Sequence, residues 1–423
     1  MTTFIRFFSL LITAWTPPAR ADDDAVEPLI ERAVDANPSL LDLRAQTQSL
    51  RELAAVAGTW TDPIISVEYA NVPPDSLSLS ESAMSGLQLR VQQTLPSPGQ
   101  NALQREVAAL DAEQHALQVQ EAELQLQVAI RKTWWMLAQT AQLQAVTRQH
   151  LDRTRELLSA AQARYETGAT GQHAVLRLTV LADRLRDDLG DFDTARLQLS
   201  AMLDESTGQK PGSTVAVPDT VTPLPPPPGA DWGQLAQDHR PALQALQVRQ
   251  DVAARQAALA RADKRPDVTI WGGYRIRAAA AVPGGDVDLV SAGISVPVPA
   301  GSARRADGQQ AAAQQQGRAA SAQTDAMMLQ ILAGVHSHRA AWQRAWDKAN
   351  TYDETLIPNA QAALSTTRAD FSVGRADFAS LFDAEVALLD LERARIRAAI
   401  QTHLQDAEMR ALIGTQPPTG APQ

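Results

Sequence analysis

The chain has 423 residues, no cysteine and a formal net charge of −10. An acidic surface repels nucleic acid, and the short basic clusters at 261–265 and 304–305 are too small to reverse that, so we expect no nucleic-acid partner. Without cysteine the chain has neither a disulfide nor an N-terminal lipid on cysteine, so its stability has to come from burial or from assembly.

The first 21 residues have the layout of a secretory signal peptide. Arg6 precedes an apolar run from Phe7 to Trp15, and the Ala-Arg-Ala at 19–21 supplies a cleavage site of small residues. The run is shorter than the roughly 20 apolar residues of a spanning helix. We therefore expect residues 1–21 to be removed during export, the other reading being a buried N-terminal helix.

The remainder of the chain is a tandem duplication. ARYETG at 163–168 aligns without a gap with ADFSVG at 369–374, and earlier segments align at a nearly equal offset, Pro63 with Pro266 for example. This predicts a first repeat at 22–221, a linker at 222–231, a second repeat at 232–414 and a tail at 415–423. Four consecutive prolines make the linker a stiff, extended spacer or, less simply, a ligand for a proline-binding module.

Each repeat begins with a predicted helix, at 25–59 and 231–263, followed by two predicted strands. Apolar and polar residues alternate at 63–72 and 87–96 in the first repeat and, less cleanly, at 266–277 and 287–298 in the second. Trp271 interrupts the second pattern, because it falls on the face that should be polar.

The strands have the length of membrane strands, about ten residues in a tilted barrel. A soluble hairpin packed on helices is the alternative, but it does not need a whole strand face of glutamine and arginine. A closed barrel takes about eight strands and lipid forbids open edges, so four strands per chain predict a barrel shared among several copies.

Two long helical hairpins complete the repeats. Their turns are predicted at 168–171 and 374–377, where glycines interrupt runs of good helix formers. Leu103, Leu110, Leu117 and Leu124 form a heptad seam typical of a coiled coil. The returning helices at 169–208 and 375–414 are shorter than the outgoing ones, which leaves room for the first helix of each repeat to stack end to end with them.

These features resemble the outer membrane efflux proteins of the TolC type. The resemblance rests on the Tyr/Phe-x-x-Gly motif at both turns, on LFDA at 381–384, and on LPSPG at 95–99 and VPVPAG at 296–301, where strands lead into helices. It implies a mainly α fold with a small membrane β portion, a TolC-like trimeric α/β barrel. The loop at 71–84 and the LPSPG junction look most like the heavy-metal efflux branch.

The resemblance also implies a location and partners. The chain is expected as a homotrimer in contact with lipid in the outer membrane of a Gram-negative bacterium, with a long periplasmic part. Its expected function is that of a duct, possessing no enzymatic activity, that receives substrates, heavy-metal cations among them, from a periplasmic adaptor and an inner-membrane pump of the resistance-nodulation-division type.

Site residues follow from the same resemblance. The expected periplasmic gate comprises Asp383, Ser380, Asp377 and Arg375. Of these, only Asp383 matches an acid of the family's gate ring, because the second acidic position falls on Ser380. The expected adaptor-contacting surface comprises the hairpin tips, namely Gly168, Thr170, Gly171, Gly374, Arg375 and Asp377. Pro358 is the candidate hinge, because its repeat equivalent is Asp152 and a proline inside a helix removes a hydrogen bond.

Two rival classes are weaker. An enzyme lacks support, because the seven histidines are scattered and no nucleophile elbow, phosphate loop or paired-carboxylate motif stands out; we expect no catalytic residue, cofactor or metal site. A periplasmic coiled-coil adaptor or a structural protein of the cell envelope would also use long helices. An adaptor, however, would have one hairpin rather than two, and neither class needs paired amphipathic strands.

Overall fold

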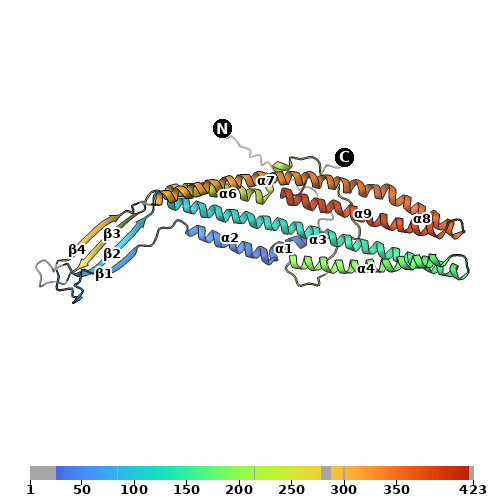
Figure 1. Ribbon diagram of the computed structural model, residues 1–423, viewed down its shortest axis with the longest axis horizontal. Coiled ribbons are helices and arrows are strands. Elements are labelled where there is room, and N and C mark those ends of the chain that lie inside the picture. Colours follow the sequence, from blue (N-terminus) through green and yellow to red (C-terminus); the bar gives the residue numbers. More distant parts are fainter. Residues whose placement is uncertain (1–24, 83, 214, 278–286, 299–300, 419–423) are drawn as a thin grey trace, which may run out of the picture. The chain divides into compact units, whose positions relative to one another are not determined.

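The computed structural model describes residues 25–82, 84–213, 215–277, 287–298 and 301–418 (Figure 1). The expected signal peptide, residues 1–21, lies outside this part of the chain. The chain divides into two units. Unit 1 comprises Met1–Leu41, Glu121–Arg240 and Leu329–Gln423, and unit 2 comprises Asp42–Gln120 and Pro241–Met328.

Helices dominate both units, and each repeat contributes one long hairpin. The helices are α1 (Glu27–Ala36), α2 (Pro38–Val56), α3 (Gln100–Glu166), α4 (Gln172–Ser206), α5 (Trp232–His239), α6 (Pro241–Ala262), α7 (Ser302–Thr351), α8 (Ile357–Ser372) and α9 (Phe378–Ile413), with a π-helical turn η2 (Tyr352–Leu356) between α7 and α8. Helix α3 alone has 67 residues, or about 100 Å at 1.5 Å per residue. None of the helices in the described ranges combines the length and apolar character needed to span a membrane.

Unit 2 contains a four-stranded antiparallel sheet in the order β1-β2-β3-β4 (Figure 1). Its strands are β1 (Ile64–Ala70), β2 (Gly86–Leu95), β3 (Val268–Ile276) and β4 (Leu289–Ser295), each within a few residues of a predicted range. The central β2–β3 pair joins the two repeats. Trp271 stands opposite Gln92 and therefore lies on the polar face, as its place in the alternation predicts.

The two faces of this sheet differ in character. One face carries Gln88, Arg90 and Gln92 of β2, where the Arg90 guanidinium lies 4.7 Å from the ring centre of Trp271. The other face is apolar and exposed, with Val67 at 67%, Ile294 at 71% and Val290 at 80% exposed. A bare apolar face on every strand indicates a surface that some apolar medium or partner covers.

The predicted first helix of each repeat is in fact two helices, so the expectation of single helices at 25–59 and 231–263 is wrong. Residue 37 separates α1 from α2, and residue 240 separates α5 from α6. Both second helices begin with a proline, Pro38 and Pro241. Proline fits the first helical position because an N–H group there would have no acceptor within the helix. The residue before a proline is driven out of the helical region, and Asn37 is extended with ψ at 120°.

The returning helices end at these breaks. Gly208, just after α4, has a φ of 67°, and a side chain there would meet the Ala36 carbonyl oxygen at 2.9 Å. Gly414, after α9, has a φ of 75°, and a side chain there would meet the His239 carbonyl oxygen at 2.3 Å. Asn37 also donates a hydrogen bond from Nδ2 to the Ser206 carbonyl at 2.9 Å. The end-to-end meeting expected from the helix lengths is therefore present in both repeats.

The core of unit 1 is built around tryptophans. Trp134 and Trp135 of α3 are buried, and the Trp135 ring stacks on His403 of α9 at 3.7 Å between centres. Trp134 donates its indole N–H to the Ala216 carbonyl at 3.1 Å, and Trp342 of α7 donates to the Leu224 carbonyl at 2.8 Å. The irregular segment between the repeats is thus fastened to helices of both repeats.

The proline-rich linker is likewise held in place. Val221, just before it, is buried, and its carbonyl accepts a hydrogen bond from Arg395 Nη1 at 3.0 Å. The Leu224 amide donates to Thr402 Oγ1 at 2.8 Å. The linker therefore packs on α9 instead of serving as a free spacer.

Candidate functional site

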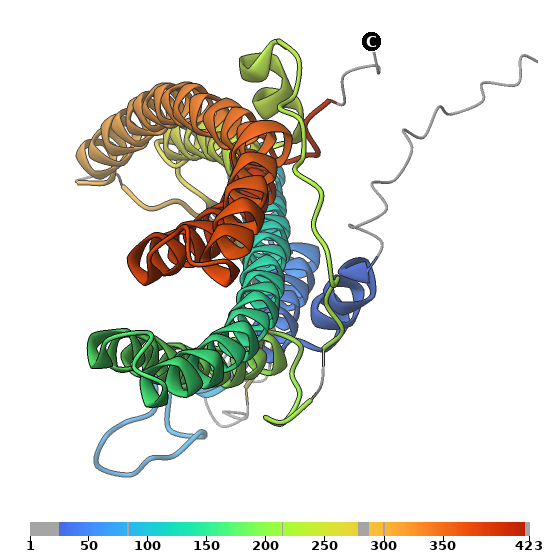
Figure 2. The same ribbon diagram turned by 90° about the vertical axis from the view of Figure 1, so that its right-hand side faces the viewer.

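The two hairpins of unit 1 end in turns of the same construction, visible end-on in Figure 2. In the first, Gly168 has a φ of 73°. Its amide donates a hydrogen bond to the Tyr165 carbonyl, and the Ala169 amide donates one to the Arg164 carbonyl. In the second, Gly374 has a φ of 77°, with matching bonds from the amides at 374 and 375 to the carbonyls at 371 and 370. Both are Schellman motifs, whose left-handed residue is usually glycine.

The turns differ in how the returning helix begins. Asp377 caps α9: its Oδ1 accepts hydrogen bonds from the Ser380 amide at 2.9 Å and the Ser380 hydroxyl at 2.6 Å. These bonds, the hydroxyl bond foremost, lower the pKa of the Asp377 carboxyl. The equivalent residue in the first turn, Gly171, offers no side-chain cap. Two expected gate residues, Asp377 and Ser380, therefore bind each other.

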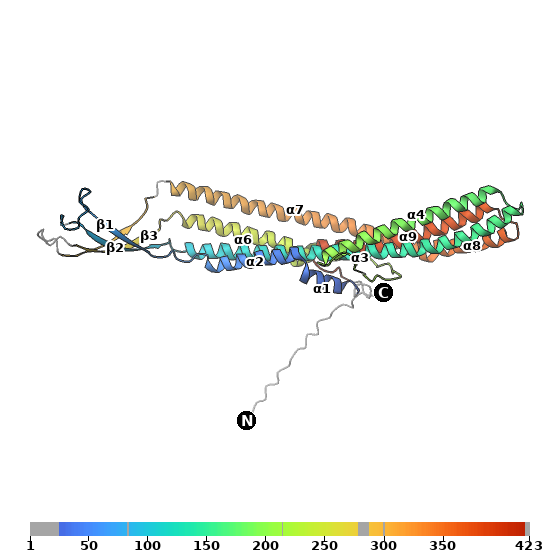
Figure 3. The ribbon, with the colours of Figure 1, turned by 90° about the horizontal axis from the view of Figure 1, so that it is seen from below.

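Apolar packing joins the two hairpins near their turns. Ala161, Ala174, Leu178 and Phe378 form a buried cluster drawn from α3, α4 and α9. These helices run alongside α8 towards the turns in Figures 1 and 3. The hairpins thus form one packed end in which the turns themselves remain exposed, including Gly168, Gly171, Gly374 and Arg375.

Arginines of the first hairpin cover phenylalanines of the second. The Arg164 guanidinium lies 4.7 Å from the ring centre of Phe371 and also donates to the Phe371 carbonyl at 3.3 Å. The Arg177 guanidinium lies 4.1 Å from the ring centre of Phe382. Such cation–π contacts contribute about 0.5–1 kcal/mol at exposed sites, so they hold the hairpins together only weakly.

Asp383, the expected gate acid, lies beside this packing. Its Oδ1 is 3.4 Å from Arg177 Nη2, and its side chain is 70% exposed. An exposed ion pair is worth less than about 1 kcal/mol. Part of the negative charge expected at Asp383 is therefore balanced by an arginine of the same chain. The repeat alignment carried a signal for this pair, because Arg177 is the repeat equivalent of Asp383.

Pro358 lies just after the π-helical turn η2, near the start of α8. Proline has no N–H to donate and its ring crowds the carbonyl four residues earlier, here that of Glu354. A π turn widens the helix at that point and accommodates the misfit. Helix α7 thus continues through η2 into α8, so the proline marks a local irregularity and not the end of a helix.

The π turn is tied to α9. Asp353 accepts hydrogen bonds from Arg395 Nε at 2.9 Å and Arg395 Nη2 at 3.1 Å. This two-point contact fixes the guanidinium plane. Because the same arginine bonds the carbonyl of Val221, the irregular turn, α9 and the segment before the linker meet at one side chain.

Comparisons with known proteins agree with this architecture. Residues 232–415 match the family model "Outer membrane efflux protein". The fold is similar to that of the outer membrane protein VceC from Vibrio cholerae, at 20% identity and a TM-score of 0.76, with 92% of this chain and 96% of that chain covered. No curated protein sequence matches the chain.

Two further solved structures share the fold. The outer-membrane channel OprN has 17% identity and a TM-score of 0.79, covering 93% of this chain and 90% of that chain. CusC, a protein that forms a transmembrane channel, has 13% identity and a TM-score of 0.78, with 92% of each chain covered. The TolC-like fold expected from the sequence is therefore confirmed, and the second repeat matches the family model that the resemblance names.

Proposed function

We propose that the whole chain is the outer membrane duct of a tripartite efflux system, because residues 232–415 match the model of the outer membrane efflux protein family. Channels of this family are trimers that work with an adaptor and an inner-membrane pump. For this chain the adaptor and the pump, expected to be of the resistance-nodulation-division type, are parts of the proposal.

The two-faced sheet carries this proposal. Its apolar face is exposed along all four strands, while the opposite face bears glutamine, arginine and serine. Strands of seven to ten residues with this alternation suit a barrel wall, in which one face contacts acyl chains and the other a water-filled lumen. In the described chain, β1 and β4 are edges with one neighbour each, so closure needs further copies.

The hairpin tips are the proposed adaptor contact. A side chain added at Gly168 or Gly374 would meet no atom within 4 Å, so both turns face open space. Thr170, Gly171, Arg375 and Asp377 lie in the same turns. In the chain, the 67 residues of α3 separate β2 from the first tip.

The proposed gate is centred on Asp383. Three copies around an axis would bring three carboxylates together, each with Arg177 of its own chain alongside. Ser380 stands in place of a second acid, which leaves a gate with less negative charge than the family pattern implies, while Asp377 keeps its charge and caps α9. Heavy-metal cations are the proposed substrates, because the loop at 71–84 and the LPSPG junction resemble those of the heavy-metal efflux branch.

A periplasmic adaptor or a structural envelope protein is the other candidate. It shares the helical hairpins, but an exposed apolar sheet face would have no medium to cover it in the periplasm. Conductance separates the candidates directly.

Purified protein reconstituted in a planar bilayer should form ion-conducting channels with a single unitary conductance. The matching preparation from outer membrane fractions should migrate as a heat-modifiable oligomer. An adaptor or structural protein would give neither result, so absence of conductance from a correctly folded oligomer would refute the duct.

A further inference from the structure

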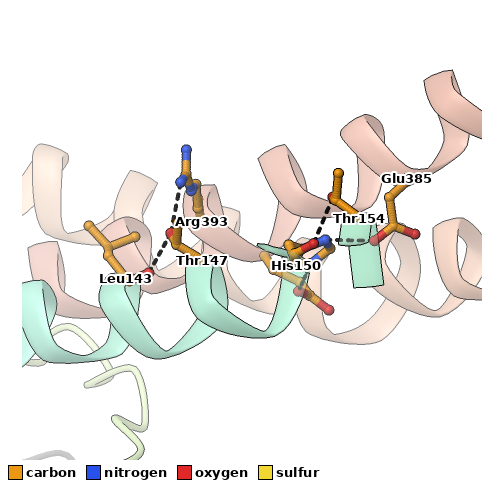
Figure 4. A network of polar contacts seen from close by, with 7 residues as sticks. Leu143, Thr147, His150, Thr154, Glu385 and Arg393 are labelled. Carbon is orange, nitrogen blue, oxygen red and sulfur yellow. Dashed lines mark hydrogen bonds and ion pairs between the residues drawn. The ribbon is translucent and has the colours of Figure 1, made fainter. Parts of the chain in front are cut away.

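A buried histidine bridges the two hairpins between two carboxylates (Figure 4). His150 of α3 is 1% exposed, with Nδ1 2.8 Å from Glu385 Oε1 and Nε2 2.8 Å from Glu392 Oε2. Both glutamates belong to α9, so these contacts connect the first repeat to the second. An ionised carboxylate can accept hydrogen bonds but cannot donate one, and a neutral imidazole has a single N–H donor. Hydrogen bonds from the ring to two ionised glutamates therefore require the imidazolium.

Two ion pairs lie near the cluster. Arg393 of α9 donates to Thr147 Oγ1 of α3 and to Asp188 of α4, each at 2.7 Å. On the other side, Glu385 lines an open groove of about 590 Å³ together with Arg153 of α3 and Arg368 of α8. Arg368 is also 3.8 Å from Glu156 of α3. The groove gives solvent, and hence protons, a route to the edge of the cluster.

The surroundings favour the charged imidazole. Burial acts to lower the pKa of His150, but the hydrogen bonds from the ring to Glu385 and Glu392, and the negative charge of both, outweigh burial and raise that pKa above its usual 6.5. A raised pKa means that the stabilisation is fully present below about pH 6.5 and is lost as the pH rises through the folded-state value. Above that pH one ring nitrogen presents a lone pair to a carboxylate.

The cluster lies at about the same distance from the hairpin turns as Pro358. His150 is 18 residues before Gly168 and Glu392 is 18 residues after Gly374, or about 27 Å from each turn, and Pro358 is about 24 Å from the second turn. Glu385 is nearer the tip. Of the two contacts, the one to Glu385, 11 residues after Gly374, lies between the level of Pro358 and the turn, and it restrains that part of the second hairpin.

We propose that His150, Glu385 and Glu392 form a proton-dependent clamp that holds the second hairpin against the first and releases it as the pH rises. Resting on the proposed function, the clamp would regulate the gate: the hairpin ends separate more freely once His150 loses its proton. The device needs no ligand besides the proton.

The absence of cysteine makes a distance measurement direct. Spin labels at Ala169→Cys and Val373→Cys, both exposed turn positions, report the separation of the tips within one chain when labelled chains are diluted with unlabelled ones. Between pH 5.5 and 9 the distance distribution should change from narrow to broad, with a midpoint above 6.5.

Three variants test the assignment. His150→Gln should remove the pH dependence and leave the distribution broad throughout. Glu392→Gln, at the more exposed partner, should shift the midpoint down by roughly one unit or more. His336→Gln, at an exposed histidine of α7, is the matched control and should behave like the parent.

A parent distribution that does not change across this range would overturn the clamp, as would a pH response that survives in His150→Gln. If His150→Gln does not fold, the midpoint in Glu392→Gln decides: an unshifted midpoint rejects the assignment. The distance measurement does not involve transport. If no channel forms in bilayers, the duct proposal fails but the clamp can still be confirmed. If the distances do not respond to pH, the clamp fails but the duct proposal is unaffected.

Discussion

Gly168 and Gly374 show what a single residue does at the tips. Each has a positive φ that other residues adopt at a cost of roughly 1 kcal/mol, and each faces open space. A large side chain there changes the outer surface of the tip more than the fold beneath it.

Gly168→Trp should therefore abolish efflux in cells while the oligomer assembles normally, because the bulky side chain blocks the adaptor. Gly99→Trp is the matched control: Gly99 also has a positive φ, 86°, with nothing within 4 Å, but it precedes α3 at the opposite end of that helix. Export of a toxic substrate and heat-modifiable migration are the two measurements. Normal efflux from Gly168→Trp would exclude the first tip as the contact, and loss of the oligomer would assign the glycine to folding.

Residue patterns in the sequence predict the turns better than the contacts between hairpins. A glycine after a long helix predicts a left-handed cap, and both caps are present. The bonds of His150 to α9 span 235 and 242 residues, and a lone histidine in a helical run carries no sign of them. The Arg177–Asp383 pair, by contrast, can be predicted from the sequence in principle, because the two residues are equivalent in the two repeats and face each other.

At the scale of the element, proline explains a failure of prediction and strand alternation explains a success. Pro38 and Pro241 align between the repeats, yet the helices were expected to run through them, because a proline at the first helical position does not disturb the apolar pattern around it. Strand alternation, by contrast, is a local property with period two, and it located all four strands of the described sheet.

Pro358→Ala restores the amide that the helix lacks and removes the crowding of the Glu354 carbonyl. The π turn should then relax towards a regular α-helix, which stiffens the passage from α7 to α8. If Pro358 is the hinge, the open fraction in planar bilayers should fall while the unitary conductance stays the same.

The control is Asn359→Ala, next to the proline and likewise exposed. It keeps the proline and should open as often as the parent. An unchanged open fraction in Pro358→Ala would make the proline a static feature that merely suits the curvature of a tunnel wall.

At the scale of the whole molecule, the exposed sheet demands assembly. Four strands cannot close a barrel, and the apolar face cannot remain in water. Three copies supply twelve strands, four from each chain, which is enough for a lumen wider than one filled by side chains. The strand count therefore requires several copies of the chain, and the choice of three copies belongs to the proposed function.

The two faces of β1 offer a paired test of that assembly. Val67 lies on the apolar face and is 67% exposed, while its neighbour Glu68 points to the polar face opposite Gln88. Arginine on the lipid face of a membrane strand costs about 2–4 kcal/mol near the bilayer midplane, and each trimer carries three copies. Val67→Arg should therefore deplete the heat-modifiable trimer from outer membranes, whereas Glu68→Arg should leave it intact, because a lumen-facing arginine stays in water. If both variants assemble equally well, the apolar face does not contact lipid and the barrel has to be abandoned; if only Glu68→Arg fails, the faces have been assigned the wrong way round.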